Sequence, residues 1–508
     1  MAFSEEHLRF ILGFKLKNLR LEHGFSLKEA SQKAGLSISY LSEIEKGKKY
    51  PKAEKLLALA GSYGISFDEL VMVEGQDDMS PLEDSLDSGF FQEFPFHLFG
   101  LHAEDLFSLL TTSPEKADAL VRTFLEVGQM YDFRVEHILF AALRAHQKMH
   151  HSYFPDLEEA AESFSSGPSW KNREISEVNL RRFLENEWRY IIDDKFLTQH
   201  PTLHSFRSVF IPGKRPRLFV NRRLLPSQKA FIFAKEIGTR ILGIETRATT
   251  SSWIKVKSFE QVLNNYRTSY FAGAFLMNQS DLSSGLRTIF RQSSWNPSEM
   301  LELMRRFDAT PEMFFYRVGQ LAHTHFGLSS HYFMRLSHHG GRSQFEVTKM
   351  LNLTTLSLPQ GYSSNEHYCR KWAGMRLLGE RSRQREIAYP DLPARTGPTI
   401  QAQRARFSLG GEHFFSFSMS RTMRLSPEDD SSVILGFPID ENFRSAVSFW
   451  NDDQISEDVV GITCERCPLG PDECDVRMAE PLQLRKESDI SRFEQSLQEL
   501  EDQFSDTT

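Results

Sequence analysis

The chain has 508 residues, of which 40% are hydrophobic and 25% charged, and its net charge is -8. This length accommodates several domains. The start, Met1 to His7, carries two acids where a secretory signal has basic residues, and no run of about 18 apolar residues is present. Because only four cysteines occur, a disulfide-stabilised secreted domain is disfavoured. We expect a cytoplasmic protein with no membrane partner.

An early segment, Ser26 to Gly47, predicts two short helices around a tight turn. Ser26 can cap the first helix, and Glu29, three residues later, can complete a capping box. Gly35 suits the left-handed conformation of the turn, and Ser37 can cap the second helix. This is the pattern of a helix-turn-helix, whose second helix lies in the major groove of DNA.

The charge of this region agrees with DNA binding. Between Lys15 and Lys55 ten residues are basic and five are acidic, although the whole chain is acidic. Positive charge is therefore concentrated where phosphates would be met. Leu41 and Ile44 give the second helix a buried face, so its opposite face is expected to approach the bases. The candidate DNA-binding residues are Ser26, Lys28, Ser37, Ser39, Tyr40, Glu43, Lys46, Lys48 and Lys49.

The segment resembles the Cro/CI-type helix-turn-helix family, including its Glu45-x-Gly47 motif and Pro51. An acidic stretch with Ser, Gly and Pro follows from Glu74 to Glu93, and it predicts a domain boundary. Apolar residues at helical spacing continue to Phe164. We expect a helix-turn-helix domain over residues 1–73, followed by a linker and helical connector over 74–165.

The next segment has the outline of a zinc peptidase without its ligands. Alternation over Arg207 to Arg223 predicts a β-hairpin, and a helix is predicted over Ser227 to Leu242. A zincin helix needs His-Glu-x-x-His, two zinc ligands around a general base. Here Lys235 and Thr239 occupy the ligand positions, and Glu236 keeps the position of the base. We therefore expect no peptidase activity at this site, and we expect that the protein is not an enzyme.

With a further helix predicted over Phe259 to Leu276, the outline resembles the ImmA/IrrE family, in which Glu260 falls at the position of a third ligand. We expect a degenerate domain of this kind over residues 166–335. Basic side chains are concentrated in the hairpin that precedes the predicted helix Ser227 to Leu242. They could bind the phosphates of a ligand or protect a sheet edge from pairing. The candidate ligand-binding residues are Arg215, Arg217, Arg223 and Lys235.

The C-terminal third predicts an α+β domain over residues 336–485, with helices before it in Pro297 to Phe326 and strands over Phe414 to Met423 and Ser432 to Phe437. Four thiolates can hold zinc or a [4Fe-4S] cluster. A single Cys-x-x-Cys with two isolated cysteines favours the cluster, structural zinc is the alternative, and buried thiols without cofactor remain a third interpretation. The candidate ligands are Cys369, Cys464, Cys467 and Cys474.

These features together resemble the short-chain fatty acyl transcriptional regulators, which combine a Cro/CI-type helix-turn-helix, a degenerate ImmA/IrrE domain and a C-terminal domain with cysteines. The resemblance implies sensing of acyl-CoA esters and control of acetate- or propionate-type catabolic genes. It also points to the cluster as cofactor. A redox-responsive iron–sulfur regulator and a metallopeptidase-linked repressor are the alternatives.

The last residues, 486–508, predict an acidic amphipathic tail helix. Its apolar residues step by three and four from Ile490 to Phe504, a seam that could pair two chains or dock on its own domain. We expect a homodimer on an operator of double-stranded DNA. The predicted fold class is multidomain, with an all-α helix-turn-helix domain followed by a helical connector and α+β domains.

Overall fold

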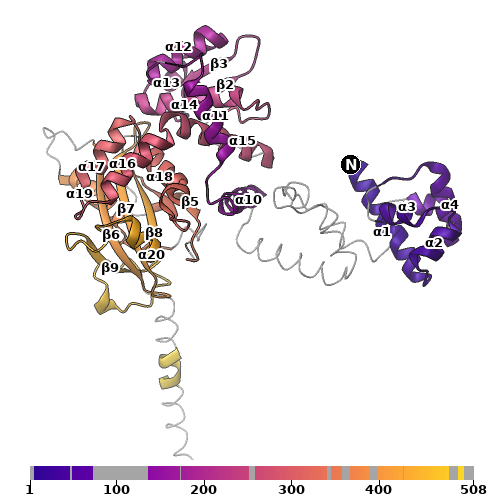
Figure 1. Cartoon of the computed structure of the whole chain (residues 1–508). Helices are drawn as coiled ribbons and strands as arrows, with labels where there is room; N and C mark the ends of the chain where they lie inside the picture. The colour runs from indigo at the N-terminus through magenta and orange to yellow at the C-terminus, as the bar shows by residue number, and fades with distance from the viewer. Residues whose placement is uncertain are drawn as a thin grey trace, which may run out of the picture. The chain divides into compact units, whose positions relative to one another are not determined.

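A computed structural model describes most of the chain outside a long segment after the first domain. The chain divides into two compact units, Met1–His146 and Gln147–Thr508 (Figure 1). No described helix is long and apolar enough to cross a membrane. The connector predicted before residue 135 and the tail beyond 496 lie outside the described residues. The described residues are 5–45, 49–71, 135–171, 173–250, 258–339, 345–356, 358, 366–387, 397–426, 428–479 and 490–496.

The first unit begins with a small helical domain. Leu16, Leu41, Ile44 and Leu59 are fully buried in its core, as the helical spacing requires. Helix α10 (Val135–Met149) contains the boundary in the chain between the first unit, which ends at His146, and the second, which begins at Gln147. The helices of the small domain are α1 (Glu5–Glu22), α2 (Leu27–Lys33), α3 (Ile38–Glu45), α4 (Ala53–Tyr63) and α5 (Phe67–Val71).

The predicted turn between α2 and α3 is confirmed. The Glu29 backbone N–H donates to Ser26 Oγ, and the Ser26 N–H donates to the Glu29 carboxylate over 2.8 Å, which completes the capping box. Gly35 has a φ of 63°, in the left-handed region. The Ser37 hydroxyl accepts from the Tyr40 N–H over 3.2 Å and so caps α3.

The second unit starts with a small α+β lobe. Its hairpin pairs β2 with β3 in antiparallel orientation, and β1 joins β3 in parallel. The predicted hairpin, the following helix and the helix over Phe259–Leu276 are therefore confirmed. The elements of this lobe are α11 (Pro155–Ser166), α12 (Glu177–Trp188), β1 (Ile191–Asp193), α13 (Phe196–Gln199), β2 (Ser208–Ile211), β3 (Arg217–Val220), α14 (Pro226–Ile241) and α15 (Phe259–Leu276).

Three helices lead from this lobe to a large sheet: α16 (Gln279–Phe290), α17 (Pro297–Arg306) and α18 (Pro311–Phe326). The helical region predicted over Pro297–Phe326 consists of two helices. The break falls at Asp308, which has a φ of 43°, and Thr310 then caps α18 by accepting the Met313 N–H. Pro311 suits the first turn because its missing N–H is not needed there.

A six-stranded mixed sheet forms the core of the C-terminal part, in the order β5-β4-β8-β7-β6-β9. Neighbours are antiparallel except β6 and β9, which are parallel. The two strands predicted from the sequence correspond to β7 and β8. The strands are β4 (Tyr332–His338), β5 (Phe345–Asn352), β6 (Thr399–Phe407), β7 (His413–Thr422), β8 (Asp430–Pro438) and β9 (Ser456–Val460).

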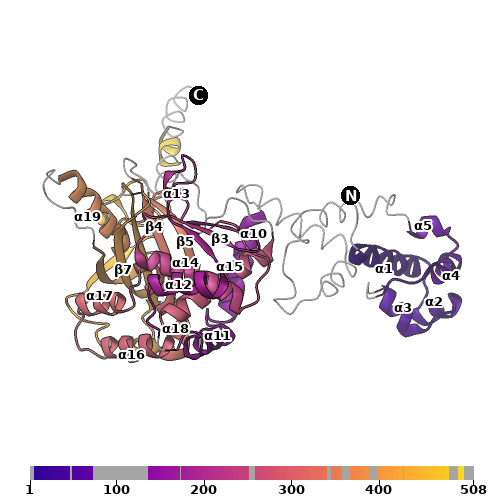
Figure 2. The same cartoon turned by 90° about the horizontal axis from the view of Figure 1, so that it is seen from above.

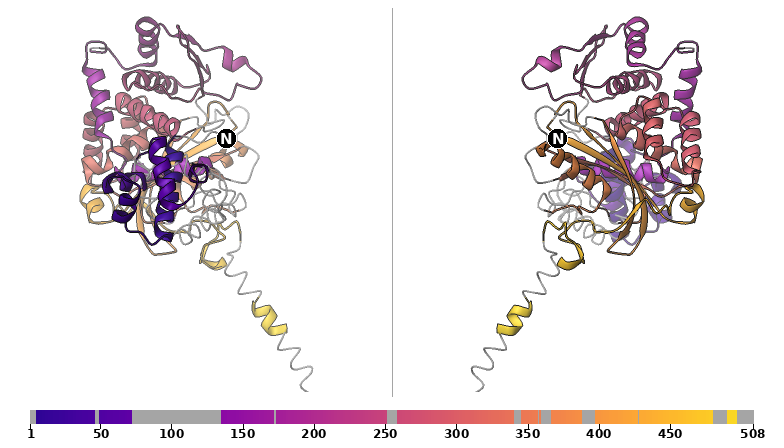
Figure 3. Two further views of the ribbon diagram at one scale, coloured as in Figure 1. Left: turned by 90° about the vertical axis from the view of Figure 1, so that its right-hand side faces the viewer. Right: turned by 90° about the vertical axis from the view of Figure 1, so that its left-hand side faces the viewer.

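Helices cover both faces of this sheet (Figures 2 and 3). Along β4 and β8, Phe333 and Leu435 pack toward α16–α18 and α20 (Glu441–Ala446), while Met334 and Ile434 pack toward α19 (Ala373–Ile387). This alternation follows from the two-residue period of a strand. The predicted fold class, an all-α domain followed by helical and α+β parts, is confirmed.

Candidate DNA interface and cysteine site

The outer face of α3 is free of the core. Leu41 and Ile44 are fully buried, whereas Ser39 is exposed and Glu43 is partly exposed. Lys49 Nζ lies 2.8 Å from the Glu43 carboxylate in an exposed ion pair. This face therefore offers hydroxyl, carboxylate and ammonium groups, which are the groups that read base edges and phosphates.

Tyr40 gathers positive charge beside α3. The ammonium of Lys55 lies 4.1 Å from the centre of its ring, and that of Lys49 lies 5.7 Å away. Such contacts hold cations over an aromatic face. The other predicted contact residues, Ser26, Lys28 and Ser37, are exposed. Two further ones, Lys46 and Lys48, are outside the described residues.

A buried ion pair between Arg20 and Glu45 in this domain was not predicted from the sequence. Glu45, 8% exposed, accepts from Nε and Nη2 of Arg20 over 2.8 and 2.9 Å. Arg20 also donates to the Phe25 carbonyl over 3.1 Å. The pair ties the end of α3 to α1. The Glu45-x-Gly47 motif was the available signal, but the sequence does not identify the partner of its carboxylate.

The degenerate zincin site is occupied by protein charges. Glu236 is buried and binds the guanidinium of Arg247 through both oxygens, over 2.6 and 2.7 Å. The Tyr190 hydroxyl donates to the same carboxylate over 3.2 Å. Here an arginine provides the positive charge next to the carboxylate, so the position of the general base is taken up by an ion pair.

The ligand positions of this helix make local bonds. Lys235 Nζ donates to Asn265 Oδ1 over 2.7 Å, and burial lowers the pKa of Lys235 to about 8. The Thr239 hydroxyl donates to the Lys235 carbonyl one turn earlier, over 2.8 Å. Glu260 accepts from the Asn264 side-chain amide over 3.5 Å. None of these contacts resembles zinc coordination.

The predicted ligand-binding arginines lie on the surface. Arg215, Arg217 and Arg223 are exposed on and after the β2–β3 hairpin. The charges acting most strongly on Lys235 come instead from Glu236, Arg247, Lys349 and Arg207. The role of Arg215, Arg217 and Arg223 in ligand binding stays a prediction.

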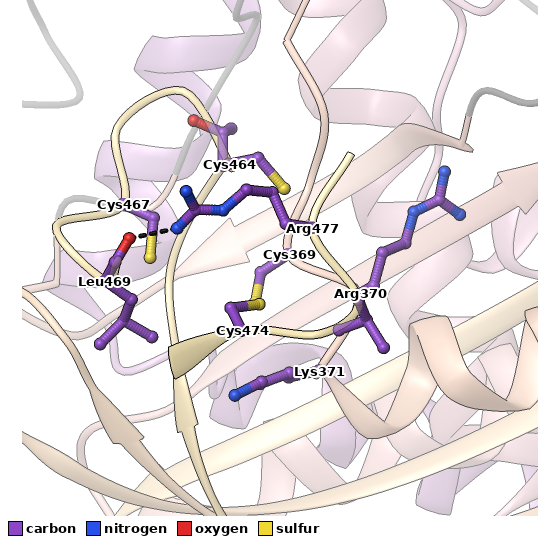
Figure 4. Close-up of a pocket in the computed structure, with 10 residues that line it drawn as sticks. Cys369, Arg370, Lys371, Cys464, Cys467, Leu469, Cys474 and Arg477 are labelled. Carbon is purple, nitrogen blue, oxygen red and sulfur yellow. Dashed lines mark hydrogen bonds between the residues drawn. The ribbon is translucent and has the colours of Figure 1, made fainter. Parts of the chain in front are cut away.

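All four cysteines line one pocket (Figure 4). Cys369 lies just before α19, whereas the other three follow β9. Cys474 directly follows a short 3-10 helix, Pro471–Glu473. Arg370, Lys371 and Arg477 line the same pocket and supply positive charge.

The two cysteine segments are joined by their backbones, an arrangement we call the clasp, formed by residues 366–369 and 461–466. The Cys369 N–H donates to the Ile462 carbonyl over 3.0 Å, and the Cys464 N–H donates to the His367 carbonyl over 2.7 Å. His367 Nδ1 lies 2.7 Å from the Glu465 carboxylate. The clasp therefore holds the Cys369 segment beside the Cys464 segment.

The thiols lie close to backbone groups of the loop after β9. The Gly461 N–H donates to Cys369 Sγ over 3.3 Å, and a Cβ at Gly461 would lie 2.9 Å from Cys467 Sγ. Burial raises the pKa of Cys369 to about 11, although the backbone N–H groups of Gly461 and Lys371 act against it; the thiols of Cys464 and Cys467 add a smaller upward shift. A thiolate there needs positive charge. Four thiols match the number that a [4Fe-4S] cluster uses.

Among the described residues, no three side chains of His, Cys, Asp or Glu lie close enough together to hold a single metal ion. This holds for the cysteine pocket and for the zincin-like helix. 

Comparison with known proteins identifies two domains. Residues 16–70 match the helix-turn-helix family model, and residues 190–318 match that of the IrrE N-terminal-like domain. A search of curated proteins gave no match. A solved structure described as a Mycobacterium tuberculosis transcriptional regulator is 17% identical, with a TM-score of 0.45, and the match covers 68% of this chain and 94% of that one. The chain therefore carries a DNA-binding helix-turn-helix domain and an IrrE N-terminal-like domain.

Proposed function

We propose that this protein is a transcription regulator that binds its operator as a homodimer, holds a [4Fe-4S] cluster on Cys369, Cys464, Cys467 and Cys474, and responds to acyl-CoA. The convergence of four cysteines on one pocket is the observation that carries the cofactor assignment. DNA binding follows from the helix-turn-helix domain. The acyl-CoA response rests on the domain combination.

Each part of the cysteine pocket has a task in this proposal. The four thiolates would hold the cluster, which would supply one-electron chemistry and cross-link the two cysteine segments. Arg370, Lys371 and Arg477 offset the negative charge of the thiolates. Gly461 leaves room for Cys467 and donates an N–H to Cys369.

The cluster is tested on protein purified without oxygen. We expect about four iron atoms per chain and a broad visible absorbance. Cys467→Ser should lose both, whereas Ser408→Ala, which removes a hydroxyl 3.8 Å from Cys467 Sγ, should retain them. One zinc and no iron would replace the cluster with a structural zinc site.

The response to ligand is tested by operator binding. Fluorescence anisotropy of an operator fragment, titrated with acetyl-CoA, propionyl-CoA and free coenzyme A, should show an acyl-dependent change in Kd. If Kd changes with the oxidation state of the cluster and not with acyl-CoA, the redox-responsive regulator is the correct function.

The metallopeptidase-linked alternative is opposed by the chemistry of α14. Lys235 and Thr239 replace zinc ligands, and Arg247 binds the carboxylate of Glu236. We therefore propose a domain without peptidase activity. Cleavage of a partner protein that a chelator abolishes would contradict this.

A further inference from the structure

We propose that five cationic side chains of the second unit bind the phosphate groups of a small molecule. They come from both the IrrE-like lobe and the large sheet. This group, the basic cluster, consists of Arg207, Lys235, Arg335, Lys349 and Arg421. The inference rests on the proposed function only for the identity of the ligand, because coenzyme A carries phosphate groups.

The fold brings these cations together from distant parts of the chain. Arg207 directly precedes β2 and Lys235 lies on α14. Arg335, Lys349 and Arg421 lie on β4, β5 and β7. None of the three sheet residues could be connected to the lobe from the sequence, because Arg335, the nearest of them, lies 100 residues after Lys235 in the chain. 

The carboxylate of Glu312 acts on four of these cations, Arg207, Arg335, Lys349 and Arg421. Glu312, on α18, accepts from Arg335 Nη1 over 3.0 Å and lies 3.6 Å from Lys349 Nζ. Burial alone would raise the pKa of Glu312, but Arg335, Lys349 and Arg207 lower it overall. The other nearby carboxylate, Glu236, is already bound by Arg247. Within the described part of the chain, Glu312 supplies one negative charge to these residues and Glu236 is engaged by Arg247, so the five cations keep an excess of positive charge.

The cations also disfavour one another. Burial lowers the pKa of Arg421 to about 10. The neighbouring cations Arg207, Arg335 and Arg424 lower it as well, whereas the carboxylate of Glu312 raises it. Burial likewise lowers the pKa of Lys349, and the positive charges of Arg335 and Arg207 lower it further. Repulsion of this kind is relieved when an anion binds.

Arg421 provides the second, independent observation. Its Nη1 atom is buried and has no hydrogen-bond partner within the described part of the chain. A buried N–H without an acceptor is costly, and a charged one more so. The oxygen of a bound anion would satisfy it. An arginine fork matches the spacing of phosphate oxygens.

A phosphate fits this group better than a carboxylate. A phosphomonoester carries close to two negative charges at neutral pH and presents three acceptor oxygens. It can therefore accept from both Arg421 and Arg207, which act on each other, whereas a carboxylate has only one charge to set against these cations. The exposed arginines of the β2–β3 hairpin are not needed.

The test is isothermal titration calorimetry of the full-length protein. The probes are coenzyme A, adenosine 3′,5′-bisphosphate, inorganic pyrophosphate and, without phosphate, propionate. We expect at least one phosphate compound to bind, and Arg421→Gln and Arg207→Gln to weaken it about tenfold or more. Arg215→Gln, an exposed arginine of the hairpin, is the matched control and should bind as the wild type does. Circular dichroism and operator binding without ligand report on the fold of each variant.

The outcomes separate the possibilities. Unchanged binding in Arg421→Gln and Arg207→Gln overturns the site, as does the absence of binding by every phosphate compound. Propionate binding with the same arginine dependence overturns the phosphate assignment. Binding of pyrophosphate but not of the nucleotide probes identifies free phosphates as the ligand. If Arg421→Gln does not fold, Arg207→Gln decides. Phosphate binding that depends on these arginines without any effect of acyl-CoA on the operator would contradict the proposed function and leave this site intact.

Discussion

The carboxylate of Glu45 determines how the recognition helix is held against α1. Both its oxygens accept from Arg20, and the carboxylate is buried. Arg20→Met should therefore lower the free energy of unfolding of this domain by about 3 kcal/mol, because it leaves a buried charge unpaired. Lys49→Met, which breaks the exposed pair with Glu43, is the control and should change the stability far less. Urea unfolding followed by circular dichroism measures both. Equal losses would show that Glu45 does not depend on Arg20.

Glu43 and Lys49 should differ in what they contribute to DNA binding. A carboxylate can accept from cytosine N4, so Glu43→Gln should change the preferred operator sequence. Lys49→Gln should weaken binding to all sequences and flatten its salt dependence, since an ammonium on phosphate releases counterions. Competition binding at several salt concentrations distinguishes the two effects. The assignment fails if neither substitution changes binding.

His331 should make the second unit sensitive to acid. It is 1% exposed, neither ring nitrogen has a hydrogen-bond partner among the described residues, and burial lowers its pKa to about 4. The unfolded chain therefore binds the proton first as the pH falls below about 6.5. Stability is lost between that pH and about 4, with roughly 2 kcal/mol lost from pH 7 to pH 5. His331→Gln should flatten this dependence, whereas His413→Gln, at an exposed position, should not.

At the scale of elements, Gly461 is the point at which the loop after β9 approaches the cysteines. An added Cβ would lie 2.9 Å from Cys467 Sγ. Gly461→Ala should therefore displace this thiol and reduce the iron content, while DNA affinity stays unchanged. Gly379→Ala is a matched control, since nothing lies within 4 Å of its Cβ; it should keep the iron and stabilise α19 slightly. Full iron occupancy in Gly461→Ala would argue against Cys467 as a ligand.

The elements predicted correctly are those specified by nearby residues. The caps of α2 and α3 need partners three residues away, and the β2–β3 hairpin needs one tight connection. The strands β4, β5, β6 and β9 were not predicted, because their stability comes from partners far along the chain. The meeting of Cys369 with the other cysteines could be proposed from residue type. The basic cluster could not, since only the folded sheet places Arg335 and Arg421 near the same carboxylate, Glu312 of α18.

At the scale of the whole molecule, the two units have separate cores. A ligand stabilises the part of the protein that binds it. Removing iron with a chelator should therefore lower the melting temperature of the second unit and leave that of the helix-turn-helix domain unchanged. Differential scanning calorimetry before and after chelation, with Cys467→Ser as the iron-free control, measures this. A shift of both transitions together would show that the units unfold as one.

The clasp has a consequence for the order in which the protein matures. It joins backbone groups of His367 and Cys369 to Ile462 and Cys464, and thereby closes a loop of roughly a hundred residues, an unfavourable contact in an unfolded chain. Most of the large sheet, from β6 to β9, lies inside this loop. Cys369 therefore meets the other three cysteines, which lie within eleven residues of one another, only when this loop has closed, and a chain truncated before the clasp lacks the complete pocket. In the proposed function, the cluster would therefore be inserted only into a chain whose C-terminal domain has already folded.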